Sequence, residues 1–133
     1  MDRDTARWLA GLIADAETQL ENGPGLTVEV INNPLCWLQI IPEVDPETGA
    51  ADGFLLNFPY EHTENPLELI TRMGIVLPPG SLMIDWQAGF STQIKIRQDV
   101  PLMALGLLVG DLLEKLMELQ PDYDLEVLID HGY

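Results

Sequence analysis

The most constraining feature of this sequence is an apolar stretch near its C-terminal end, which predicts a long helix over residues 101–120. One row of apolar residues recurs there at spacings of three and four, as in a heptad seam: Leu102, Leu105, Val109, Leu112, Leu116 and Leu119. More apolar residues stand between these positions, so most of the helix surface cannot face water. We expect Asp99 to cap the start of this helix and Pro121 to end it. Because one sheet buries only one stripe of a helix, we expect a second partner, either a subunit or another element of this chain.

A second copy of the chain is the partner that the sequence predicts for this helix. Gly106 and Gly110 are four residues apart, which would let another helix approach closely. A two-fold interface would cover the same apolar patch on both subunits at once. The predicted homodimer interface comprises Leu102, Met103, Gly106, Leu107, Gly110, Leu113 and Met117. The alternative is a monomer in which the first helix and the C-terminal strand cover this face.

The rest of the chain predicts two more helices and six strands. Apolar residues at helical spacing indicate a helix over residues 4–21, capped by Asp2 or Asp4, and Asn65 caps a second one over residues 66–73. Alternating apolar residues indicate strands over residues 26–30, 35–41, 54–58, 82–86, 92–96 and 123–129. Short connections favour antiparallel pairing. The sequence therefore predicts a single α+β domain over residues 1–133, in the order α-β-β-β-α-β-β-α-β, with an antiparallel sheet of five to six strands covered on one side by helices.

The charge of the chain excludes several classes of partner. It has 22 acidic residues against 6 Lys and Arg, a net charge of −16. Such a chain lacks the clustered cations that nucleic acids and anionic membranes require. It would attract basic partners with a salt-dependent on-rate, although ordinary acidic solubility is the alternative. With no segment as long as the roughly 18 apolar residues of a membrane span and one lone thiol, we expect a cytoplasmic protein.

Motifs of catalysis are missing from the sequence. It contains no nucleophile elbow, no phosphate-binding loop and no dinucleotide fingerprint. Histidine occurs only as His62 and His131. His62 stands beside Glu61 and Glu64, which could make a metal site or an acid–base pair. We interpret this segment instead as a polar loop before a helix, and we predict no catalytic residue and no enzyme activity.

Three further groups of residues could form sites. The loop with Asp45, Glu47 and Asp52 could hold calcium, but it lacks the regular alternation of oxygen ligands found in an EF-hand loop, and we predict a solvated loop. Cys36 lies within an apolar strand, which predicts a buried and inert thiol. The aromatic side chains of Trp37 and Trp86 are expected in the core. The sequence therefore predicts no metal and no cofactor.

The second half of the sequence resembles a known family. The predicted hairpin of residues 82–86 and 92–96, followed by Asp99-Val100-Pro101-Leu102 and the leucine-rich helix, is similar to that part of the YbjN-like domains. The order of elements over residues 4–120, with the small size and acidity, resembles the related class I type III secretion chaperones. The resemblance implies homodimers that bind extended segments of client proteins without enzymatic activity. The predicted strand over residues 123–129 departs from this pattern and could cover a sheet edge.

These observations together predict a non-enzymatic, chaperone-like module that binds a segment of a basic or partly unfolded partner protein. The alternative is an acidic inhibitor or immunity-type protein that blocks a basic site of a partner enzyme. A small enzyme or ligand-binding domain that uses His62 and nearby carboxylates is a third hypothesis. Nucleic acid and membrane are not expected as partners.

Overall fold

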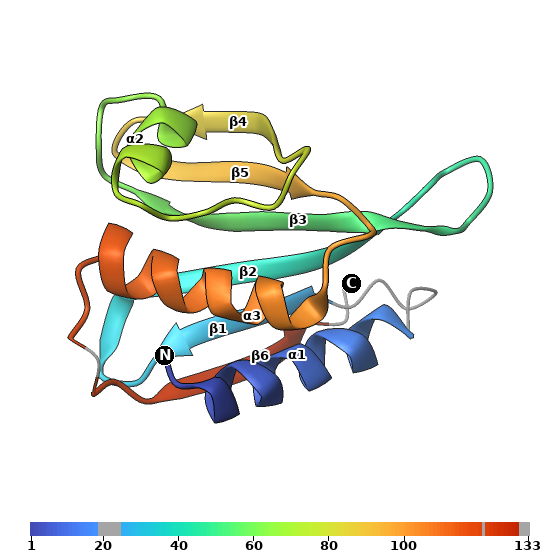
Figure 1. The fold of residues 1–133 in the computed structure, drawn as a ribbon, viewed down its shortest axis with the longest axis horizontal. Coiled ribbons are helices and arrows are strands. Elements are labelled where there is room, and N and C mark those ends of the chain that lie inside the picture. Colours follow the sequence, from blue (N-terminus) through green and yellow to red (C-terminus); the bar gives the residue numbers. More distant parts are fainter. Residues whose placement is uncertain (19–24, 121, 131–133) are drawn as a thin grey trace.

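A computed structural model describes residues 1–18, 25–120 and 122–130 of the chain. Six strands form one sheet in the order β4-β5-β3-β2-β1-β6, and every described pairing is antiparallel (Figure 1). The elements are α1 (Arg3–Glu17), β1 (Gly25–Val30), β2 (Asn33–Val44), β3 (Ala51–Tyr60), α2 (Pro66–Arg72), β4 (Leu82–Gln87), β5 (Phe90–Ile96), α3 (Leu102–Asp111), the π-helical turn η2 (Leu112–Leu116) and β6 (Leu125–Asp130). The predicted α+β class, order of elements and antiparallel pairing are confirmed.

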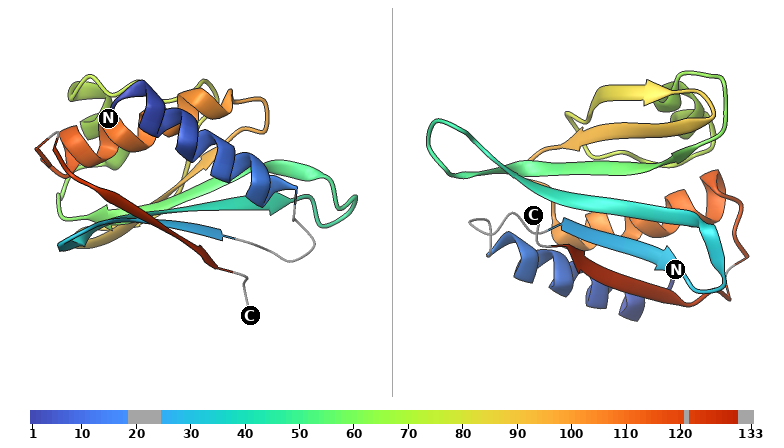
Figure 2. Two further views of the ribbon diagram at one scale, coloured as in Figure 1. Left: turned by 90° about the horizontal axis from the view of Figure 1, so that it is seen from below. Right: turned by 180° about the vertical axis from the view of Figure 1, so that it is seen from behind.

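The hydrophobic core lies between the sheet and the helices, all of which cover the same face (Figure 2). Alternate residues of each inner strand point into it, as in the run Phe54, Leu56 and Phe58 of β3, each fully buried. The other face of the sheet carries no helix in the described part of the chain. Trp37 lies on that face and is half-buried, so its predicted place in the core is wrong. The neighbouring Leu35 is 74% exposed.

The apolar C-terminal helix is shorter than predicted at both ends. Pro101 occupies the cap position of α3 without a side-chain hydrogen bond, and Asp99 instead pairs with Arg97, whose Nε lies 3.3 Å from Asp99 Oδ1. The expected cap at Asp99 is therefore wrong. The helix passes into the π-helical turn η2 and ends before Glu118, which has a positive φ of 59°. The first helix ends at Glu17, and residues 19–21 of its predicted range lie outside the described residues.

The second partner of this apolar helix is α1 of the same chain. A Cβ atom on Gly106 would lie 2.7 Å from the backbone oxygen of Ala6, and one on Gly110 would lie 2.6 Å from Cβ of Met1. The Met1 ammonium also pairs with Glu114 of η2. The two glycines therefore allow α1 to approach α3 closely.

No helix among the described residues is long and apolar enough to cross a membrane.

Candidate functional site

The predicted dimer interface does not lie on one exposed surface. Gly106, Gly110 and Leu113 are buried within the chain. Leu107 is 40% exposed. The rest of the set is partly buried and comprises Leu102, Met103 and Met117. Of this predicted interface, only Leu102, Met103, Leu107 and Met117 are exposed enough to contact a second copy in this conformation.

A pocket of about 450 Å³ contains the histidine that the sequence singled out. It lies where β2 begins, β3 ends and η2 ends, and it is lined by Asn33, Leu35, Cys36, Pro59, Glu61, His62, Leu116, Met117 and Glu118. Glu64, the other expected partner of His62, is bound to Arg72 instead, with 2.6 Å between Oε2 and Nη1. The His62 ring packs beside the Tyr60 ring at a centroid distance of 5.5 Å. His131 lies outside the described residues.

The chemistry of this pocket gives no support to a catalytic role. Burial, and secondarily the negative charge of Glu61, raise the pKa of the Cys36 thiol, so it stays protonated and is a poor nucleophile. Cys36 is buried, as predicted. No hydrogen bond joins it to His62 among the bonds between described residues, as a nucleophile and its base would require. No group of three His, Cys, Asp or Glu side chains within the described ranges could hold a metal ion.

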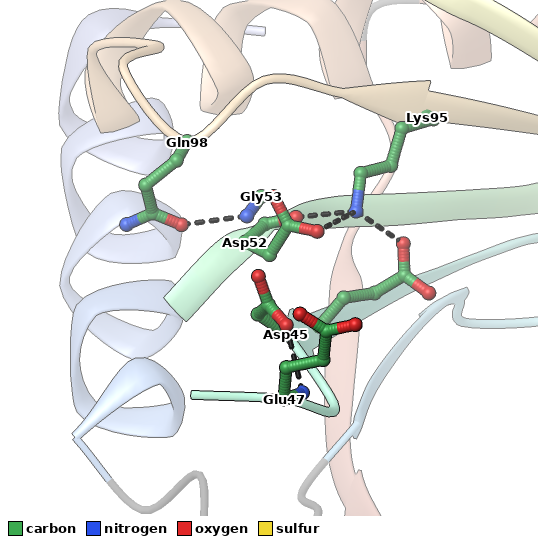
Figure 3. Close-up of polar contacts among 7 residues, drawn as sticks. Asp45, Glu47, Asp52, Gly53, Lys95 and Gln98 are labelled. Atoms are coloured by element: carbon green, nitrogen blue, oxygen red, sulfur yellow. Dashed lines mark hydrogen bonds and ion pairs between the residues drawn. The ribbon is translucent and has the colours of Figure 1, made fainter. Parts of the chain in front are cut away.

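The acidic loop between β2 and β3 is held by a lysine on β5 (Figure 3). Lys95 Nζ lies 2.6 Å from Glu43 Oε1 and 3.8 Å from Asp52 Oδ2. Asp45 turns back into its own loop, where its Oδ1 accepts a 2.8 Å hydrogen bond from the Glu47 amide. Glu43 and Asp52 therefore share Lys95, whereas Asp45 serves its own loop, so the carboxylates of the candidate calcium site do not share one contact.

The free edge of β6 is the most unusual surface of the molecule. β6 pairs with β1 over six residues without a register shift, and no other described strand pairs with its outer edge. Glu126 lies directly opposite Glu29, and neither carboxylate forms an ion pair with any described residue. Like charges at opposed positions are unfavourable. Around this edge the sequence from 118 to 130 carries only acidic charges, on Glu118, Asp122, Asp124, Glu126 and Asp130.

The opposite edge of the sheet differs in regularity and in charge. β4 has a register shift between Met83 and Asp85, and such bulges protect natural edges from pairing. Both edges expose apolar side chains, Leu82 and Ile84 on β4 and Leu128 and Ile129 on β6, so the apolar surface does not distinguish them. β6 has neither a bulge nor a proline, so it is the better template for an added strand.

Comparisons with known proteins add no relative. No family model matches the chain, and no match was found to a curated protein or to a solved structure. The surfaces described above are therefore the basis for a functional hypothesis. Among them, the regular edge of β6 combines free backbone groups with unpaired negative charge. The sequence had indicated this strand by its alternation and suggested that it covers a sheet edge, but it did not reveal that Glu126 lies opposite Glu29.

Proposed function

We propose that this protein is a non-enzymatic binding module that takes an extended, basic segment of a partner protein onto the free edge of β6. The observation that carries the proposal is the unbulged edge of β6, which lies within a segment whose charged residues are all acidic. An extended segment that adds to a sheet edge gains affinity from backbone hydrogen bonds and specificity from alternate side chains. This chaperone-like role is the one that the sequence had suggested.

The charges of the edge select the partner. A second copy of β6 carries no basic residue and would add only further negative charge beside Glu126 and Glu29, so like charges oppose self-pairing there. A strand with Lys or Arg at alternate positions would instead relieve the repulsion between Glu126 and Glu29. Rejection of the wrong partner by repulsion is a common source of specificity.

Three related expectations stay part of the proposal. A homodimer is still predicted, with Leu102, Met103, Leu107 and Met117 as its candidate contacts on α3 and η2. A cytoplasmic location fits the single buried thiol. The inhibitor alternative also uses an acidic surface, but it requires a folded basic enzyme as partner, whereas the edge of β6 requires only an extended segment.

The proposal predicts salt-dependent binding of a basic β-forming peptide. Calorimetry should detect a peptide of alternating Lys and Val, and its affinity should fall steeply with ionic strength because exposed charges are screened. The double variant Glu29→Lys/Glu126→Lys should weaken binding about tenfold or more, on the order of 1.4 kcal/mol.

The matched control is Asp45→Lys/Glu47→Lys in the loop between β2 and β3, which changes the net charge by the same amount. We expect it to weaken binding about twofold at most, because it acts only over a distance through screened solvent. Equal losses in both variants would show that total charge governs binding, and would contradict a site on β6. Binding to folded basic enzymes but to no peptide would support the inhibitor alternative.

A further inference from the structure

A second pocket lies where β6 begins, beneath the start of α1. It has a volume of about 250 Å³, which suits one large side chain, and it is lined by Met1, Asp2, Thr5, Trp8, Tyr123, Asp124 and Leu125. α1 lies in the helical layer over the border of the sheet that β6 forms (Figures 1 and 2), and the pocket lies between the start of α1 and the start of β6. A strand added to the free edge of β6 would therefore pass beside the opening of this pocket.

The pocket presents two carboxyl groups beside an aromatic ring. Asp2 accepts a 2.7 Å hydrogen bond from the Thr5 amide through Oδ1, and this bond lowers the pKa of its carboxyl group. Asp124 is exposed and forms no ion pair with a described residue. Trp8 lies on the apolar side of α1 but is 47% exposed. An indole face beside carboxylates favours a cation with a planar, weakly hydrated head.

Tyr123 gives the pocket an uncharged wall. Its hydroxyl oxygen is fully buried, so a ligand in the pocket does not reach it. Burial raises the pKa of Tyr123 most, and the neighbouring Glu114 carboxylate, followed by Asp111 and Asp2, raises it further, so the phenol stays neutral. Tyr123 therefore lines the pocket without adding charge, and the negative charge that faces a ligand is that of Asp2 and Asp124.

We propose that this pocket binds the guanidinium group of an arginine in the segment that pairs with β6. The proposal rests on the proposed function, because the segment brings the arginine to the pocket. A guanidinium group offers five N–H donors in a plane, which suits the Asp2 and Asp124 carboxylates while the plane stacks on Trp8. A lysine has three donors on one point charge and cannot stack in this way.

The test compares peptides that differ at one position, with Arg, Lys or the uncharged isostere citrulline, on the wild-type protein and on pocket variants. Wild-type protein should bind the Arg peptide about tenfold more tightly than the Lys peptide. Asp124→Asn and Trp8→Leu should each remove most of this preference. Asp2→Asn, which keeps a capping side chain, should reduce it as well.

The control is Asp122→Asn, which removes the same charge two residues away, outside the pocket lining. It should leave the ratio of Arg to Lys affinity unchanged. Thermal unfolding should be nearly unaffected by Asp124→Asn, which changes only an exposed side chain, so this variant separates binding from folding.

The outcomes distinguish this inference from the proposed function. Equal binding of the three peptides, unchanged by Trp8→Leu and Asp124→Asn but weakened by Glu29→Lys/Glu126→Lys, would overturn the arginine pocket and leave the edge of β6 as the site. A preference for Lys over Arg would also overturn it. No binding of any basic peptide to the wild-type protein would overturn both.

Discussion

Replacing Gly53 with alanine is expected to destabilise the folded protein by about 3 kcal/mol or more. Gly53 stands near the start of β3 with a φ of +84°, and a Cβ atom there would lie 2.1 Å from the backbone oxygen of Ile96. Its amide also donates a 2.7 Å hydrogen bond to Oε1 of Gln98 (Figure 3). An alanine at this position would have to adopt a left-handed backbone conformation. Its Cβ atom would also clash with backbone atoms, which cannot move aside as a flexible side chain can.

Gly49→Ala is the matched control for this prediction. Gly49 has a similar φ of +72°, but nothing lies within 4 Å of the Cβ position. Only the conformational term remains, so the free energy of unfolding should fall by about 1 kcal/mol. Urea denaturation measures both variants against the wild type. If Gly53→Ala and Gly49→Ala lowered the free energy of unfolding equally, β3 would not approach the end of β5 as closely as it does in the structure.

Gly106→Ala should lower the free energy of unfolding by about 2 kcal/mol, because the new methyl group meets the backbone of α1. The Cβ position is 2.7 Å from the oxygen of Ala6. Gly11 of α1 is the control, since nothing lies within 4 Å of its Cβ position. Gly11→Ala should stabilise the protein by about 0.5–1 kcal/mol, as alanine favours a helix more than glycine does.

The same pair of variants separates two interpretations of the apolar helix. If Gly106 served only a contact between two subunits, the Gly106→Ala monomer would be as stable toward unfolding as the Gly11→Ala monomer. The substitution would then weaken the association of subunits instead. Light scattering together with urea denaturation measures both quantities. A stable variant that no longer associates would contradict the packing of α1 on α3.

The regular parts of this fold could be predicted because each has a local signal. Alternation placed β1, β5 and β6 within a few residues of their observed bounds, and Asn65 accepts the expected hydrogen bond from the Leu67 amide. The many apolar residues of the last helix correctly predicted that a second element packs against it. The sequence could not tell which element this is, because α1 and a helix of another subunit would both need the small residues Gly106 and Gly110 for a close approach.

The candidate site was less visible in the sequence than the fold. The acidic run was plain, but the opposition of Glu126 and Glu29 depends on the register between β6 and β1. Trp8 and Tyr123 are far apart in the sequence, and only the folded chain brings them to one pocket. The sequence could not reveal that the ring of Trp8 would stay half exposed on α1.

The central claim is that a basic segment pairs with the free edge of β6, and amide hydrogen exchange tests it directly. A peptide of alternating Lys and Val should slow exchange at alternate amides of Leu125–Asp130, because the outward amides of an edge strand gain partners when a strand is added. Amides of β4 should exchange as before. Protection confined to β4 or to α3, with none in β6, would contradict the proposed site.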